Sequence, residues 1–260
     1  MSTARAQIPF VLPLALFSLA FGVRLAAGDA HRSESGSIAE KKLASNWAFE
    51  PDPALPNVLI LGDSISIGYG LEVRDLLKGK ANVFRPMSED GKKPENCAGT
   101  TLGVKEIDRW IGGRKWAVIH FNWGLHDLKR VTEPGGDKTT GNPQDPRQAT
   151  VEQYAQNLER IVAKLKASGA RLVFATTTPV VPGCNNPYRD PEDPPRYNAA
   201  AVRIMEAHGI RVNDLYAFVQ PQLEKLQQPK NVHFTPAGSR ALAEAVAKVI
   251  LEELDKAQKP

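Results

Sequence analysis

Short apolar runs alternate with amphipathic stretches along most of the chain, and this alternation constrains the fold more than any other feature. Five runs have the length and composition of buried strands, at residues 58–61, 82–84, 116–121, 172–175 and 210–212. Helical periodicity marks the stretches between and after them, at residues 69–77, 102–111, 151–167, 196–208, 215–226 and 236–254. Strands that alternate with helices predict an α/β fold, with a parallel sheet covered by helices on both faces.

The composition excludes several classes of protein. Of the 260 residues, 42% are hydrophobic and 24% are charged, which is enough apolar material for one sizeable core. The 33 Lys and Arg exceed the 29 Asp and Glu by only four, and no long basic run is present, so we expect no nucleic-acid partner. Two cysteines are too few for a disulfide-rich scaffold or a cysteine zinc cage.

The first thirty residues have the features of a secretory signal peptide. Arg5 supplies a positive start, residues 8–23 are almost wholly apolar, and small residues follow. The apolar run contains Pro9 and Pro13 and is short for a membrane-spanning helix, although an uncleaved anchor is the alternative. We therefore predict removal of residues 1–30, secretion or periplasmic location, and no membrane attachment afterwards.

The rest of the chain divides into a polar leader and one domain. Residues 31–56 contain three prolines and many polar residues, which predicts an extended leader, and residues 57–256 form the predicted domain. Export would place Cys97 and Cys184 where a disulfide can persist, so the pair is either bridged or free.

Candidate functional residues lie where the predicted strands end, because ligands of parallel sheets bind outside the carboxyl ends of the strands. Ser64 follows the first strand on a tight turn into a helix, which suits a nucleophile beside backbone N–H groups, although a helix N-cap is the simpler interpretation. His233 lies in the loop before the last helix, where Thr235 and Pro236 form a helix start. Long loops at residues 86–99, 129–148 and 180–195 are candidate walls of a groove.

These residues and two further segments resemble the SGNH hydrolase, or GDSL esterase, family over about residues 57–254. The sequence Gly-Asp-Ser that ends at Ser64 is similar to the first family motif, and His233 matches the histidine of the last. The second motif falls on Ala98 and Gly99, and the third on residues 124–127, where His126 replaces the family asparagine. The resemblance implies a flavodoxin-like three-layer α/β/α sandwich with a five-stranded parallel sheet. It also implies an oxyanion hole made by Ser64, Ala98 or Gly99, and His126.

One departure from the family concerns the acid that orients the histidine. The family has Asp three residues before this histidine, whereas this chain has Lys230. Three interpretations stay open: a Ser64–His233 dyad oriented by a backbone carbonyl or water, a carboxylate from another loop, or a site that has lost most activity. Asp214 is the candidate carboxylate by topology, although it also fits the N-cap of the following helix.

The sequence therefore predicts a carboxylic ester hydrolase without a cofactor, and the family resemblance favours small acyl esters, first of all acetyl groups on carbohydrates. The alternative is a catalytically impaired relative that binds a glycan in the same groove. A metal site made by His120, His126, Asp127 and His233 is disfavoured because no metal-binding motif is present. Packing is expected for Trp110 and Trp116, whereas Trp123 is also a candidate for the groove wall.

Overall fold

The computed structural model describes residues 47–258, and these belong to one compact unit. The predicted signal peptide, residues 1–30, and residues 31–46 of the predicted leader lie outside the described residues. In the described part of the chain, no helix is both long enough and apolar enough to cross a membrane.

Five parallel strands form one sheet, as the sequence predicts. They are β1 (Asn57–Leu61), β2 (Asn82–Phe84), β3 (Val118–Phe121), β4 (Arg171–Ala175) and β5 (Arg211–Asn213). Their order in the sheet is β2-β1-β3-β4-β5, and every neighbouring pair is parallel. This is the strand order of flavodoxin-like folds, in which the order reverses between β1 and β3 and leaves a crevice at their carboxyl ends.

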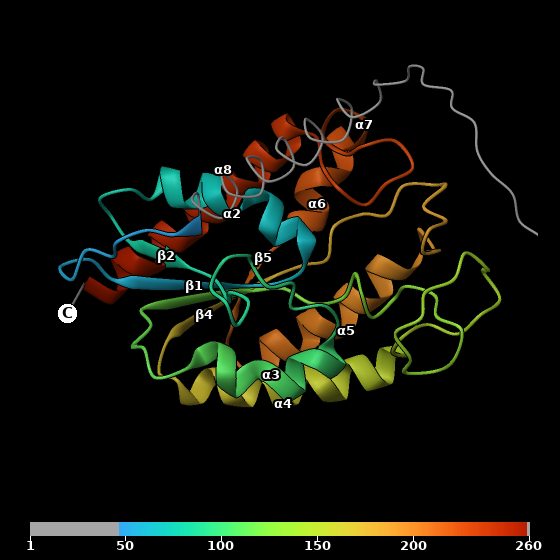
Figure 1. Cartoon of the computed structure of the whole chain (residues 1–260), viewed down its shortest axis with the longest axis horizontal. Helices are drawn as coiled ribbons and strands as arrows, with labels where there is room; N and C mark the ends of the chain where they lie inside the picture. The colour runs from blue at the N-terminus through green and yellow to red at the C-terminus, as the bar shows by residue number, and fades with distance from the viewer. Residues whose placement is uncertain (1–46, 259–260) are drawn as a thin grey trace, which may run out of the picture. The chain divides into compact units, whose positions relative to one another are not determined.

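Helices cover both faces of the sheet and complete the predicted three-layer sandwich (Figure 1). One layer contains α2 (Ser64–Leu76) and α8 (Pro236–Gln258), which pack against each other. The opposite layer contains α3 (Thr100–Ile111), α4 (Val151–Ala167) and α5 (Asp193–Ala207). Between β5 and α8 the chain forms the short helices α6 (Leu215–Val219), η1 (Gln220–Gln222) and α7 (Leu223–Leu226).

Two predicted helical stretches differ in extent from the helices of the structure. The continuous helix expected over residues 215–226 is broken, because Pro221 has no N–H for an α-helical bond and the chain forms the 3₁₀ segment η1 there. The periodic stretch expected at residues 69–77 is the later part of a helix that begins at Ser64, which agrees with the turn into a helix predicted after the first strand. Asp63 caps this helix with its side chain.

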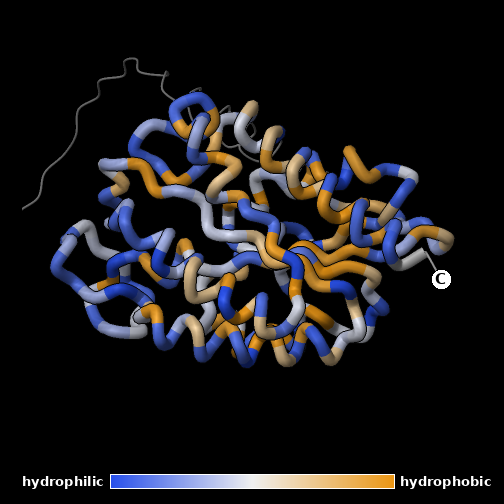
Figure 2. Tube along the Cα trace, turned by 180° about the vertical axis from the view of Figure 1, so that it is seen from behind, coloured by the Kyte–Doolittle hydropathy of each residue, from blue (hydrophilic) through white to orange (hydrophobic). Residues whose placement is uncertain are grey.

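The core consists of the sheet and the apolar stripes of the helices that cover it. All side chains of β3 are buried, and β1 is buried except at its first residue, as expected for strands covered on both faces. Figure 2 shows this arrangement as a hydrophobic centre along the strands, with mixed hydropathy along the helices. The sandwich thereby gives the loops at the carboxyl edge of the sheet a rigid support.

Candidate active site

The turn between β1 and α2 presents the hydroxyl of Ser64. The carboxylate of Asp63 accepts a hydrogen bond of 2.9 Å from the backbone N–H of Ile65 and caps the helix. Asp63, rather than Ser64, is therefore the N-cap, and the Ser64 hydroxyl is not used in capping. Ser64 is partly exposed at the first position of α2, where helical N–H groups lack intrahelical partners.

A short closed loop holds His233 against this serine. The backbone N–H of Gln228 donates to the carbonyl of His233 over 2.9 Å, and Thr235 begins α8 by accepting the N–H of Gly238 over 3.0 Å. Within this frame the Nε2 atom of His233 lies 2.9 Å from the Oγ atom of Ser64. Two residues that are 169 positions apart in the sequence are thus in hydrogen-bond contact at one edge of the sheet.

The side chain of Asn231 orients the imidazole of His233. Its Oδ1 atom lies 2.8 Å from Nδ1 of His233 and also accepts the backbone N–H of His233 over 3.1 Å. Its Nδ2 atom donates to Oε1 of Gln228 over 3.2 Å. These contacts fix the amide with its oxygen towards the imidazole, so Nδ1 carries the proton and Nε2 presents its lone pair to Ser64. The amide therefore selects the tautomer that can act as a base.

Neither Lys230 nor Asp214 takes part in this arrangement. Lys230 is exposed and has a positive φ of 54° at the turn of the loop. The carboxylate of Asp214 caps α6 by accepting the N–H of Ala217 over 3.0 Å, and it accepts the hydroxyl of Thr176 over 2.9 Å. Asp214 thus has the simpler of its two expected roles, that of a helix N-cap. The group next to His233 Nδ1 is the side-chain amide of Asn231, and not a carboxylate, a backbone carbonyl or water.

His126 lies beside the serine and the histidine with a defined tautomer. Burial lowers the pKa of His126 to about 3, and the positive charges of Lys129 and Arg189 act in the same direction. The imidazole is therefore neutral near pH 7. The ammonium of Lys129, which can only donate, lies 3.4 Å from its Nδ1 atom, so the proton is on Nε2. His126 is thus an N–H donor, as the asparagine of the family motif is.

The segment before α3 supplies the other candidate donor. Ala98 has a positive φ of 46°, which is a conformation that glycine adopts more readily and which agrees with its alignment to a family glycine. Its N–H donates to Oδ1 of Asn96 over 2.9 Å. Within the described residues the N–H groups of Gly99 and Ser64 have no such partner. Of the two expected donors, Gly99 is therefore the available one.

Ser64, His126, Asn231 and His233 line an open cavity of about 520 Å³. The residues that line it are Ser64, Asn96, His126, Gly183, Cys184, Asn185, Asn186, Pro187, Arg189, Lys230, Asn231, Val232 and His233. Two of the three expected wall loops contribute, those at residues 86–99 and 180–195. The third, at residues 129–148, does not line the cavity but supports its wall, since Arg130 and Thr140 bond the backbone of Tyr188 on both sides.

Other residues considered from the sequence lie outside the cavity. Trp123 is fully buried and its ring stacks on that of Trp110 with centroids 6.3 Å apart, so the expectation that it lines the groove is wrong. Trp116 is buried as well, and His120 is buried in the sheet next to Asn213. The described residues contain no cluster of three or more His, Cys, Asp or Glu that could hold a metal ion.

Cys97 and Cys184 are free thiols in this structure, so the disulfide that we left open is not formed. Both side chains are buried. Burial raises the pKa of Cys97 to about 12, which keeps it protonated, and burial also raises that of Cys184. Neither thiol is therefore suited to act as a nucleophile.

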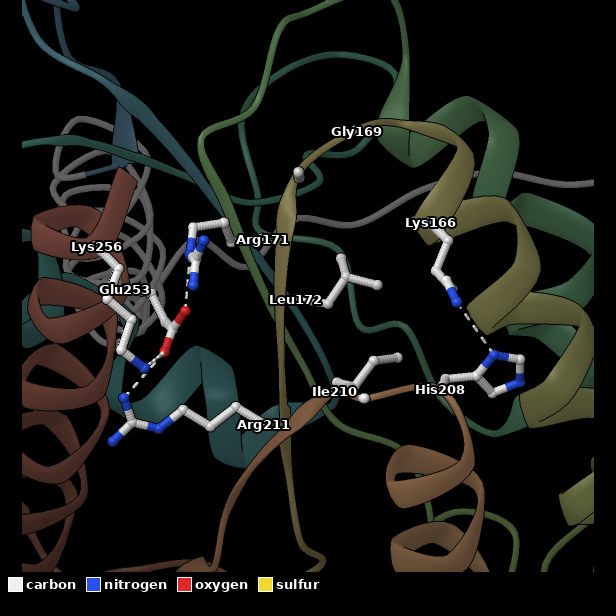
Figure 3. Close-up of a pocket in the computed structure, with 11 residues that line it drawn as sticks. Lys166, Gly169, Arg171, Leu172, His208, Ile210, Arg211, Glu253 and Lys256 are labelled. Atoms are coloured by element: carbon white, nitrogen blue, oxygen red, sulfur yellow. Dashed lines mark hydrogen bonds and ion pairs between the residues drawn. The ribbon is translucent and has the colours of Figure 1, made fainter. Parts of the chain in front are cut away.

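A second cavity of about 500 Å³ lies near the amino ends of β4 and β5, away from Ser64 (Figure 3). The buried carboxylate of Glu253 on α8 accepts bonds there from Arg171, Arg211 and Lys256 at 2.7–3.0 Å. This cluster joins α8 to the starts of two strands. No serine or cysteine is among the residues that line this cavity.

Two residues of the site were not found from the sequence. Asn231 precedes His233 by two positions, and that spacing lets an Asn side chain accept the backbone N–H two residues later, which is a local signal for an Asx turn. Arg189 lies in a predicted wall loop, but nothing in the sequence distinguishes it from the other arginines. Its burial beside Ser64 follows from the tertiary structure alone.

Comparison with known proteins agrees with this geometry. Residues 60–241 match the GDSL-like Lipase/Acylhydrolase family, which confirms the resemblance seen in the sequence motifs. No curated protein matches the chain. Similar solved structures include a lipase/acylhydrolase from Enterococcus faecalis, with 18% identity and a TM-score of 0.59 over 75% of this chain and 95% of that one.

Two further similar structures are esterases by their descriptions. An acetyl xylan esterase has 12% identity and a TM-score of 0.58, over 75% of this chain and 99% of that one. A psychrotrophic esterase from Pseudoalteromonas sp. has 15% identity and a TM-score of 0.55, over 76% of this chain and 98% of that one. At such low identity, these likenesses establish a shared fold.

Proposed function

The chain belongs to the GDSL-like lipase/acylhydrolase family, and from this premise we propose that it is an exported serine esterase that cleaves small acyl esters, with acetyl groups on carbohydrates as the first candidates. The observation that supports this proposal most directly is the chain of contacts from Ser64 Oγ to His233 Nε2 at 2.9 Å and from His233 Nδ1 to Asn231 Oδ1 at 2.8 Å. A serine, a base and an orienting group in this order are the parts that acyl transfer requires.

The first half of the reaction forms an acyl-enzyme. The Ser64 oxygen attacks the ester carbonyl while His233 Nε2 takes the hydroxyl proton, and Asn231 Oδ1 accepts a bond from the resulting imidazolium. The tetrahedral intermediate places negative charge on the former carbonyl oxygen. The N–H groups of Ser64 and Gly99 and the Nε2–H of His126 would donate to that oxygen. The intermediate then collapses, and His233 returns its proton to the departing alcohol.

Water completes the cycle in the second half. His233 removes a proton from a water molecule, whose oxygen attacks the acyl-Ser64 carbonyl. The second tetrahedral intermediate uses the same N–H donors. Its collapse restores the Ser64 hydroxyl with the proton from His233 and releases the carboxylic acid, so atoms and charge balance without a cofactor.

The same contacts favour catalysis over the glycan-binding alternative. A protein that only binds a glycan would not need a serine, a histidine and an amide joined by hydrogen bonds. The cavity also suits a sugar, because four asparagines line it and supply both donors and acceptors for hydroxyl groups. The esterase fold of the acetyl xylan esterase is compatible with this substrate class.

The proposal is tested by hydrolysis of p-nitrophenyl acetate. We expect Ser64→Ala to lower kcat/KM by at least about 10³-fold, because the nucleophile is lost. Ser168→Ala, at the end of α4 and outside the cavity, is the matched control and should keep the parental rate. Equal rates for Ser64→Ala and the parent protein would refute the assignment of Ser64. Export is tested separately, by sequencing the amino terminus of the protein found outside the cytoplasm, which should begin near residue 31.

A further inference from the structure

The cavity around Ser64 is positively charged. Arg189 and Lys230 line it, and among the described residues that line it there is no Asp or Glu. Lys129 is close by, with its Nζ atom 3.4 Å from His126 Nδ1. A neutral substrate such as an ordinary sugar acetate has no use for this charge, and the proposed acyl transfer assigns no role to Arg189 or Lys230.

Arg189 is held rigidly but its terminal nitrogens are not used by the protein. The residue is only 7% exposed, and its Nε–H donates to the carbonyl of Leu125 over 2.9 Å. Within the described residues, its Nη atoms make no hydrogen bond or ion pair. The charge of Asp63 acts on Arg189 from a distance, but no ion pair forms between them. A guanidinium taken from water is expensive unless it is paired, which points to a partner supplied by a ligand.

The buried Arg85 offers a contrast within the same protein. It is 6% exposed, and its Nη atoms donate to Ser66 Oγ, to the carbonyl of Gly62 and to the carbonyl of Glu95 at 2.8–3.3 Å. Arg85 therefore has the pattern of a structural arginine, with its terminal nitrogens directed at the protein. Arg189 has a comparable burial and lines the cavity, but among the described residues its Nη atoms have no hydrogen-bond partner.

Lys230 is placed to add a second cation at the rim. It sits at the turn of the His233 loop, and its aliphatic stem lies against Gly183, since a Cβ built on Gly183 would lie 3.0 Å from Lys230 Cγ. The side chain is exposed and lines the cavity. The cavity that contains Ser64 is therefore lined by one buried arginine and one exposed lysine.

On the basis of the proposed esterase function, we propose that the substrate is an anionic ester: a carboxylate near the scissile bond binds Arg189 by two parallel N–H···O bonds, with Lys230 assisting at the rim. The planar guanidinium matches a carboxylate in this way, and such charge-assisted pairs are among the strongest hydrogen bonds in proteins. For a carbohydrate substrate, this means an acidic sugar.

Matched pairs of esters test the proposal and locate the charge. The first pair, 4-acetoxybenzoate and its neutral methyl ester, tests for a negative charge on the alcohol part of the substrate. The second pair, 4-nitrophenyl succinate and its neutral methyl ester, tests for a negative charge on the acyl part. We expect kcat/KM for the anionic member of at least one pair to exceed that of its neutral partner by about 10- to 100-fold. The preference should fall at high salt, because the interaction is ionic.

Variants assign the preference to residues. Arg189→Gln should lower the anionic-to-neutral ratio about 10-fold or more, and Lys230→Gln by a smaller factor, while Arg160→Gln on the exposed surface of α4 should leave it unchanged. Thermal unfolding identifies loss of fold in Arg189→Gln. Ratios near one in the parent protein, or a ratio that neither Arg189→Gln nor Lys230→Gln changes, would overturn the proposal.

Binding measurements separate this proposal from the proposed function. Calorimetric titration of the Ser64→Ala protein with each ester measures affinity without turnover. If the anionic ester of a pair binds more tightly than the neutral one, and Arg189→Gln abolishes this difference, the anion site is supported even if the parent protein hydrolyses neither ester. Equal affinities would refute the anion site even if the parent protein proved to be an active esterase.

Discussion

Replacement of Asn231 measures how far a neutral amide substitutes for the usual acid of a catalytic triad. In Asn231→Leu the side chain keeps a similar volume but loses the oxygen that lies 2.8 Å from His233 Nδ1. The imidazole then loses a hydrogen bond that becomes charge-assisted when His233 takes the serine proton. Such bonds contribute about 1.5–3 kcal/mol, which corresponds to a fall of about 10- to 150-fold in kcat.

Asn231→Asp should have the opposite effect at high pH. Coulomb's law at the observed 2.8 Å gives about 1.5 kcal/mol with the dielectric constant of water and about 6 kcal/mol with an effective value of 20. Because His233 is exposed, we expect the lower value, or about a 10-fold rise in limiting kcat. A carboxylate also favours the imidazolium of the resting enzyme, so the acid limb of the pH–rate profile should move to higher pH.

The assay is the pH dependence of kcat and kcat/KM on p-nitrophenyl acetate, with thermal unfolding of each variant as a check of the fold. Asn142→Leu, in an exposed loop outside the cavity, is the matched control and should have the parental profile. Parental kcat and an unchanged pH profile in Asn231→Leu would refute the reasoning, because another group would then orient His233.

Two further predictions concern the oxyanion donor and the ion cluster on the opposite edge. His126→Ala should lower kcat on p-nitrophenyl acetate about 10²- to 10³-fold, because one oxyanion donor is lost. His126→Asn keeps an N–H donor and should therefore retain much of the parental kcat. Similar losses of kcat in both variants would contradict the donor role. Burial raises the pKa of Glu253, but its bonds to Lys256, Arg211 and Arg171 outweigh this and lower it to about 2. The stabilising effect of the Glu253 carboxylate is therefore present above about pH 4.5 and lost as the pH falls towards 2. Glu253→Gln should lower the free energy of unfolding at pH 7 by about 1–3 kcal/mol and make it depend less on pH between 4.5 and 2. Circular dichroism measures the unfolding. An acid-unfolding curve identical to that of the parent would contradict the second prediction.

Much of the architecture follows from local patterns. Buried strands require continuous apolar runs, and covering helices require one apolar stripe, so the order of elements was readable and α4 was predicted over its full range, Val151–Ala167. The prediction failed where a local effect competes with periodicity. Pro221 breaks the helix after Val219.

By itself, the sequence determined a parallel α/β sandwich, a serine on the turn after the first strand and a histidine before the last helix, because each of these is a local property of a few neighbouring residues. The contact of those two side chains was only an expectation, and the tertiary structure decided it at 2.9 Å. The structure also decided that an amide replaces the orienting acid and that a buried arginine lines the cavity. Such features depend on atoms from distant segments that only packing brings within hydrogen-bond reach, and no spacing along the chain encodes them.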